Sequence, residues 1–267
     1  MAVPPCAKAR IEQTLANRLL AALGPADRHH LLADAVFVEL GATTVLGLGG
    51  TALAHAYFPT TCMISLLAPE SGDKRLVLGL TGYEGVYGGA CALGIFSTAF
   101  DAVVTGAGQA WQIDAGRLAA HGRSSPALLR LLSRFLYVEL RQLGTQAICS
   151  HFHSLRQRLA RCLLMSQDRM RSSDLWLTHD DLSQMLGARR AGVTVAAGDL
   201  QALGLIRYTR GHIFIADRAQ LLTQTCACYF QDQTIYSQTM WTPTPAEPAN
   251  GTKLPHPQPG PPTRSAE

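Results

Sequence analysis

Two adjacent arginines, Arg189 and Arg190, stand in a stretch whose side chains could read a nucleic acid. A guanidinium group carries planar donors that fit the two acceptors on a guanine edge or the oxygens of a phosphate. Three other polar residues lie within the same stretch, and a further arginine lies in a turn beside a glycine. The candidate DNA-contacting residues are Thr178, Arg189, Arg190, Thr194, Arg210 and His212.

The elements that position these side chains can be predicted from spacing. Thr178 and Asp181 form a capping pair that predicts the start of a helix, and apolar residues follow it at helical spacing: Leu182, Met185 and Leu186. Gly187 ends this helix, because glycine enters the left-handed conformation at little cost. A second helix is expected at once, with an apolar face formed by Val193, Ala196, Ala197, Leu200 and Leu203.

A hairpin is predicted after the second helix. Gly204 ends that helix, and residues 205–208 and 212–215 alternate apolar and polar around the turn at 209–211. The order of cap, turn glycine, helix and hairpin from Leu177 to Ile215 is typical of a helix-turn-helix with a wing. The alternative is a helical hairpin whose arginine pair is merely solvated.

Cysteine and histidine side chains form a second group with possible chemistry. On a strand, Cys149, His151 and His153 would share one face, but on a helix only Cys149 and His153 do. The spacing reveals no fourth ligand, so structural roles near a hinge are expected and no metal is assigned. Cys226 and Cys228 lack a second pair and are placed in a terminal helix.

Sequence motifs of enzymes are lacking. The chain has no Gly-x-Ser-x-Gly and no phosphate-binding Gly-Lys-Thr loop. The glycines from Gly47 to Gly50 are not followed by the helix or the acidic residue that a dinucleotide site needs, so we interpret them as a loop. We expect no enzymatic activity and no cofactor.

The stretch from Thr178 to Ile215, together with Arg158–Leu164 (RLARCLL), resembles the CRP/FNR superfamily of bacterial transcription regulators. The resemblance extends over about residues 10 to 225 and implies a cyclic-nucleotide-binding-like sensor domain, a dimerisation helix and a DNA-binding domain. It also implies duplex DNA, a second copy of the chain and RNA polymerase as partners. Arg190 matches an arginine that reads guanine in relatives, whereas Ala191 and Val195 stand where many members have a glutamate and some an arginine.

The expected fold class is α+β. Short apolar runs separated by Gly, Pro and Asp predict an N-terminal antiparallel barrel or jelly roll, at Val36–Leu40, Val45–Leu48, Met63–Leu67, Leu76–Leu80 and Ala102–Thr105. Ser125 as the cap and Pro126 in the first turn predict the start of a long helix that ends at about Phe152. Its wide leucine stripe suits packing on the barrel and on a second copy of the chain. A plain core helix is the alternative.

We divide the chain into a sensor domain (1–124), a dimerisation helix (125–153), a winged helix-turn-helix domain (154–240) and a disordered proline-rich tail (241–267). The hinge is placed near His153 and Ser154. The chain is 47% hydrophobic and 16% charged, which indicates a globular protein. Its seven scattered cysteines and its polar N-terminus favour a cytoplasmic protein, and no membrane partner is expected.

The predicted effector pocket has an unusual composition. No lysine or arginine occurs between Arg75 and Arg117, although a buried phosphodiester needs a compensating cation. We expect that cyclic AMP and cyclic GMP do not act through this pocket and that apolar residues line it: Ala90, Leu93, Ile95, Phe96 and Phe100. The effector therefore stays unknown.

These features predict a sequence-specific DNA-binding transcription regulator that binds an inverted repeat as a homodimer. Residues 144–220 contain ten basic against six acidic residues, which is compatible with a polyanionic partner. The alternative is a signalling or interaction module that does not bind DNA and keeps a degenerate helix-turn-helix.

Overall fold

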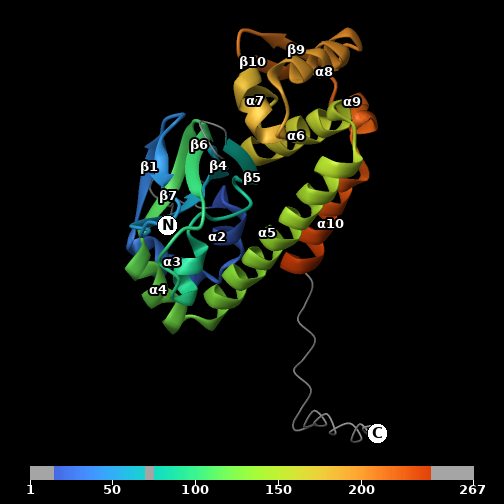
Figure 1. The fold of residues 1–267 in the computed structure, drawn as a ribbon. Coiled ribbons are helices and arrows are strands. Elements are labelled where there is room, and N and C mark those ends of the chain that lie inside the picture. The colour runs from blue at the N-terminus through green and yellow to red at the C-terminus, as the bar shows by residue number, and fades with distance from the viewer. Residues whose placement is uncertain (1–14, 70–74, 242–267) are drawn as a thin grey trace, which may run out of the picture.

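The computed structural model describes residues 15–69 and 75–241. Figure 1 shows a sheet-rich N-terminal region, a long diagonal helix and a smaller helical domain above it. The N-terminal region contains α2 (Arg18–Ala22), α3 (Pro25–Ala33), β1 (Ala35–Leu40), β2 (Val45–Gly47), β3 (His55–Pro59), β4 (Met63–Pro69), β5 (Arg75–Thr81), the 3-10 helix η1 (Gly89–Leu93), β6 (Asp101–Gly106), β7 (Gly108–Asp114) and α4 (Ala115–Ser124).

The N-terminal strands form two antiparallel sheets, in the orders β1-β7-β3 and β2-β6-β4-β5. Side chains from both sheets fill one core, which includes Phe58 and Trp111 from the first and Ile64 and Val104 from the second. The α+β class is thus confirmed, but the described sheets stay open and do not close into a barrel. The five predicted strands correspond to β1, β2, β4, β5 and β6.

The long helix α5 (Pro126–Phe152) begins and ends where the sequence predicts. The hydroxyl of Ser125 accepts a hydrogen bond from the backbone N–H of Leu128 at 3.1 Å, and Pro126 occupies the first turn. Leu128, Leu132 and Phe135 are buried in the sensor core, so the first half of α5 belongs structurally to that domain.

The C-terminal part contains α6 (Leu155–Met170), β8 (Asp174–Trp176), α7 (His179–Leu186), α8 (Arg190–Ala202), β9 (Ile206–Thr209), β10 (His212–Ile215), α9 (Arg218–Gln224) and α10 (Ala227–Trp241). Its helices and its sheet, in the order β8-β10-β9, share a second core. Met63, Leu67 and Val77 of the sensor domain join this core, so the two domains pack directly on each other.

We placed the last helix, α10, in the winged domain, but it packs mainly against the long helix α5. α10 packs along α5, as Figure 1 shows, and its Tyr236 and Met240 enter the core of the sensor domain. The predicted tail lies outside the described residues except for Trp241. The sequence also indicates a helix over Ile11–Leu23 and a hairpin turn at 71–73, and the start of that helix and the turn lie outside the described residues as well. Among the described helices, none has both the length and the apolarity needed to cross a bilayer.

Candidate nucleic-acid interface

The helix-turn-helix is built as its local sequence predicts. Thr178 Oγ1 accepts from the N–H of Asp181 at 3.1 Å, and the Asp181 carboxylate accepts from the N–H of Thr178 at 2.7 Å, which completes a capping box before α7. Gly187 ends α7 in the left-handed conformation at φ 55°. α8 then begins at Arg190 with Arg189 as its N-cap residue.

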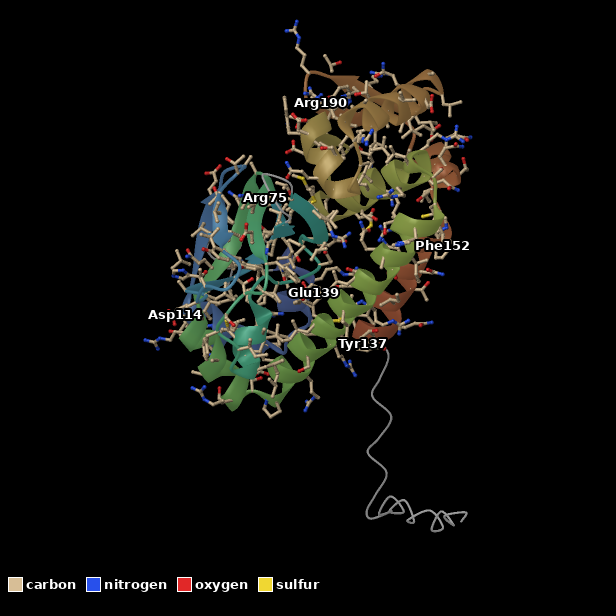
Figure 2. All side chains as sticks on the ribbon, in the orientation of Figure 1. Arg75, Asp114, Tyr137, Glu139, Phe152 and Arg190 are labelled. Carbon is tan, nitrogen blue, oxygen red and sulfur yellow. The ribbon has the colours of Figure 1, made fainter. Side chains whose placement is uncertain are left out.

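The second helix has one buried and one exposed face. Val193, Ala196, Ala197 and Leu200 are buried as predicted, but Leu203 is 55% exposed because it follows the last turn of α8 and caps it. Arg189, Arg190 and Thr194 are all exposed, and Figure 2 shows Arg190 on the outer side of the domain. The arginines and Thr194 therefore lie on the solvent side of the helix.

Arg190 is held in place by a neighbour. Its Nε lies 3.5 Å from Asp180 Oδ1, and both side chains are largely exposed. A surface ion pair of this kind contributes about 0–1 kcal/mol, so it can be exchanged for contact with a phosphate or a base. Thr194 donates to the carbonyl of Arg190 at 3.0 Å and lies 3.0 Å from His179 Nδ1.

Two of the candidate side chains are already engaged within the domain. The Thr178 hydroxyl donates to the Asp181 carboxylate at 2.7 Å, so its first role is to cap α7. His212 lies 3.0 Å from Asp174 Oδ1, and its ring packs against Trp176 with the ring centroids 4.6 Å apart. These contacts give His212 a structural role in the wing sheet.

The wing is a two-residue hairpin. Thr209 pairs with His212, which leaves Arg210 and Gly211 as the loop, with φ 48° and 82°. Two successive positive φ values are typical of a type I′ turn, which matches the twist of the flanking strands. The turn projects the exposed side chain of Arg210 at the tip of the wing.

The positive charge is distributed differently from our expectation. From Thr178 to Ile215 the chain has four arginines and three aspartates, so the helix-turn-helix itself is almost neutral. Much of the surplus lies on α6, where Arg161 and Arg169 are buried and paired with Asp232 and Glu84. The basic balance of residues 144–220 is therefore partly structural.

Several surface residues of this domain were not among the candidate DNA-contacting residues. Val195, noted from the sequence only as a departure from relatives, is 66% exposed on α8 beside Thr194, and Trp176 is 72% exposed on β8. His179 and Tyr208 stack with parallel rings, with centroids 4.2 Å apart, and join α7 to the wing. The three-residue strand β8 is too short to show an alternating pattern, so no sequence signal could have placed Trp176 in the wing sheet.

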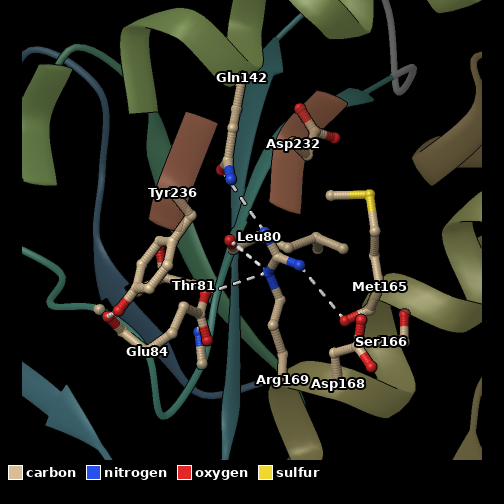
Figure 3. Close-up of polar contacts among 12 residues, drawn as sticks. Leu80, Thr81, Glu84, Gln142, Met165, Ser166, Asp168, Arg169, Asp232 and Tyr236 are labelled. Carbon is tan, nitrogen blue, oxygen red and sulfur yellow. Dashed lines mark hydrogen bonds and ion pairs between the residues drawn. The ribbon is translucent and has the colours of Figure 1, made fainter. Parts of the chain in front are cut away.

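Arginines of α6 bond both to the rest of the winged domain and to the sensor domain. Arg158 donates to the carbonyl of Leu186 at the end of α7. Figure 3 shows Arg169 at the centre of a second contact, where it donates to the carbonyl of Leu80 at 2.8 Å and forms an ion pair with Glu84 at 3.2 Å. These bonds connect α6 to both domains.

The stretch from Gly85 to Ala99, where the resemblance places the loop of the effector pocket, is closely packed at its start, and we call it the effector loop. A Cβ on Gly85 would lie 2.1 Å from the Phe135 ring, and one on Gly88 would lie 3.1 Å from Ala56, so the loop glycines permit contact with α5 and β3. Leu93, Ile95 and Phe96 are exposed instead of lining an enclosed apolar pocket, because the chain runs along the surface from Leu93 to Ser97, after the buried part of η1. That part of our expectation was wrong.

Comparison with known proteins agrees with this geometry. Residues 157–223 match the family described as the Crp-like helix-turn-helix domain. No curated protein matches the chain.

Several solved structures share the fold. A CRP/FNR-family regulator from Eubacterium rectale has a TM-score of 0.60 and 16% identity and covers 79% of this chain and 98% of its own. FixK2 from Bradyrhizobium japonicum has a TM-score of 0.60 and 16% identity over 72% and 98% of the two chains. The c-di-GMP-responsive regulator CLP of Xanthomonas campestris has a TM-score of 0.59 and 17% identity over 73% and 100%.

The matched domain spans the candidate interface from α6 to α9, and the shared fold covers the sensor domain as well. The chain thus contains a Crp-like helix-turn-helix domain at residues 157–223 and shares its fold with solved CRP/FNR regulators.

Proposed function

We propose that this protein is a transcription regulator that recognises a specific inverted-repeat DNA site as a homodimer. The observation that carries the proposal is the two-faced helix α8. Its apolar side is buried in the domain core, whereas Arg189, Arg190 and Thr194 are exposed on the other side. A helix of this kind can lie in the major groove while its inner face keeps it attached to the domain.

Specific chemical roles follow from the exposed groups. Arg190 can donate two hydrogen bonds to a guanine, and the apolar side chain of Val195 suits contact with a thymine methyl group. Arg210 at the tip of the wing suits a phosphate, because a contact at the edge of the domain meets the backbone and not the bases. Arg189 is the N-cap residue and so lies at the N-terminus of α8, where a bound phosphate is also favoured.

We propose that the chain dimerises through the outer side of α5. Leu140 and Ile148 are 63% and 52% exposed, and Tyr137 and Phe152 are exposed along the same helix (Figure 2). A groove of about 700 Å³ between α5 and α10 is lined by Leu140, Ile148 and Phe230. A second copy of the chain would cover these apolar groups and place two recognition helices for an inverted repeat with half-sites roughly 34 Å apart.

Regulation by cyclic nucleotides is not part of the proposal. The effector loop has no basic side chain from residue 76 to 116, and its glycines are used for close packing on Phe135 and Ala56. RNA polymerase is the further partner expected of a regulator of this class. A module that does not bind DNA is the alternative, and the near-neutral charge of residues 178–215 is the observation in its favour.

The experiment is selection of bound duplexes from a random DNA pool, followed by affinity measurements with two variants. Arg190→Ala should weaken the selected site by about 1–3 kcal/mol and relax the base preference, since it removes a base contact. Arg210→Ala should weaken all duplexes alike and reduce the salt slope of log K by roughly 1, since it removes a phosphate contact.

The control is Arg117→Ala. Arg117 is an exposed arginine that pairs with Asp34 at 3.6 Å, but it lies in the sensor domain, so its loss should leave DNA affinity unchanged. A selection that yields no enriched sequence would favour the alternative module. Identical selectivity of the Arg190 and Arg210 variants would show that α8 does not read bases.

A further inference from the structure

Four side chains with metal-binding atoms converge where α5 ends. Cys149 lies in the last turn of α5, and His153 is the residue that caps it. Cys226 lies between α9 and α10, and Cys228 lies in the first turn of α10. The sequence placed these residues in two separate groups, because 77 positions separate Cys149 from Cys226.

The distances among the four ligand atoms are short and similar. Cys149 Sγ lies 3.6 Å from Cys226 Sγ, and Cys228 Sγ lies 3.6 Å from His153 Nδ1. All four atoms lie within 4.8 Å of one another. The three cysteines are buried and His153 is half-buried, whereas His151 is exposed and its Nδ1 lies 3.1 Å from the carbonyl of Ala147.

This spacing fits a single tetrahedral ion. Zn–S and Zn–N bonds of about 2.3 and 2.0–2.1 Å place two sulfurs about 3.8 Å apart and a sulfur and a nitrogen about 3.6 Å apart. A four-iron cluster attaches each cysteine to a different iron and so requires ligands separated by the width of the cluster. A ligand set of three thiols and one imidazole within 4.8 Å therefore favours one zinc ion.

An ordinary apolar role explains the cluster less well. Cys149, Cys226 and Cys228 form a buried cluster of their own, separate from the two large cores of the molecule. A disulfide between Cys149 and Cys226 would leave Cys228 and His153 in contact with it but without a function. An ion bound by all four residues gives each of them a role.

We propose that Cys149, His153, Cys226 and Cys228 form a structural zinc site that fastens the α9–α10 turn to the end of α5. The site has four protein ligands and no open position, as is usual where zinc stabilises a fold. Ser154 caps α6 directly after His153, so the ion lies at the hinge between the long helix and the DNA-binding domain. This proposal is independent of the proposed DNA-binding function.

A buried guanidinium group lies beside the cluster. Zinc with three thiolates and a neutral imidazole has a net charge of −1, which is costly to bury without a cation. The buried guanidinium of Arg161 interacts electrostatically with Cys149, Cys226 and Cys228. Arg161 also pairs with Asp232 of α10 at 2.5 Å, so the same side chain links the site to the body of α10.

The test is the metal content of the full-length chain, purified without chelator and measured by mass spectrometry. We expect about one zinc per chain, lost in Cys228→Ser and in His153→Gln. The matched controls are Cys162→Ala, a buried cysteine outside the cluster, and His151→Gln, the exposed histidine of the same helix, and both should keep the ion. Cobalt substitution should give the intense visible bands and thiolate charge-transfer band of a tetrahedral sulfur-rich site.

A second measurement uses the wild-type chain alone, so it remains decisive if the variants fold poorly. A strong chelator should lower the unfolding temperature of the wild-type chain, and added zinc should restore it. Wild-type protein with less than about a tenth of an equivalent of zinc and no cobalt spectrum would overturn the proposal. So would equal zinc contents in the His153 and His151 variants, a Cys149–Cys226 disulfide in metal-free protein, or bound iron with acid-labile sulfide.

Discussion

The surroundings of Glu139 in α5 change the pKa of its carboxyl group. It faces Thr81, which donates to its carboxylate at 3.5 Å, and it lies near Glu84 and Arg169 (Figure 3 shows the contacts of Arg169). Burial, followed by the negative charge of Glu84, raises the pKa of Glu139 to about 8, and the bond from Thr81 and the charge of Arg169 only partly oppose this. Glu139 is therefore largely protonated in the folded chain near neutral pH.

A pH dependence of stability follows. An unfolded glutamate has a pKa of about 4.3, so from about pH 4 to 8 the folded chain holds a proton at Glu139 that the unfolded chain has lost. The unfolding free energy should thus fall as pH rises through this window. Glu139→Gln removes the titration and keeps an acceptor for Thr81, so the variant should gain stability over wild type as pH rises, with the largest difference above pH 8.

The measurement is the difference in unfolding temperature between variant and wild type from pH 5 to 9. Glu39→Gln, which removes an exposed carboxylate from β1, is the control variant. A constant difference for Glu139→Gln would mean that the carboxylate is ionised in the folded chain.

For individual residues, the sequence predicted local helix caps well and contacts between residues distant in the sequence poorly. The caps at Ser125, Ser154 and Thr178 depend on residues three positions apart, so they are readable from spacing. The ion pair of Arg169 with Glu84 and the contact of Cys149 with Cys226 depend on how distant helices pack, and no local pattern encodes them.

Among the elements, those with a strong apolar period were predicted and the others were not. β7 has the sequence GQAWQID, which lacks the apolar run that marked the other strands, and the apolar run of β3 (HAYFP) is only three residues long. Both are nevertheless essential, because β7 lies between β1 and β3 in its sheet. The helix pair of the DNA-binding domain was predictable because its cap, turn glycine and apolar stripe are all local.

The outer side of α5 is the element that we propose as the dimer interface. Leu140 and Ile148 are exposed two turns apart, and burial of such side chains contributes about 1.5–3 kcal/mol each. The double substitution Leu140→Glu with Ile148→Glu would bring four carboxylates together in a symmetric dimer. We expect wild type to sediment as a dimer at micromolar concentration and this variant as a monomer with much weaker binding to the inverted repeat.

Val36→Glu is the control for that experiment. Val36 is also a large exposed apolar residue, but it lies on β1 of the sensor domain, away from α5. The control should remain dimeric. A wild-type monomer that binds single half-sites, or an unchanged dimer in the double variant, would show that another surface joins the copies.

For the molecule as a whole, the order of sensor domain, long helix and winged domain agrees with the sequence, but the path of the C-terminal helix does not. α10 runs back along α5, where Tyr236 donates to the carbonyl of Glu84 at 2.8 Å. A helix with apolar and polar residues on every side gives no sign of which neighbour it covers. The sensor domain is consequently connected to the DNA-binding domain through both α6 and α10.

We expect that cyclic nucleotides do not bind to the sensor domain. A cyclic nucleotide brought into the sensor domain would lose hydration from its phosphodiester, and residues 76–116 offer no cation in return. The backbone of Tyr87 is already paired with that of Tyr57 at 2.8 and 2.9 Å, and Gly85 and Gly88 lie against Phe135 and Ala56, which leaves little room beside the loop. Calorimetry should detect no micromolar binding of cyclic AMP or cyclic GMP, and neither should change affinity for the selected DNA. Micromolar binding that disappears on substitution of Ser97 or Thr98 would contradict this and identify the loop as a nucleotide sensor.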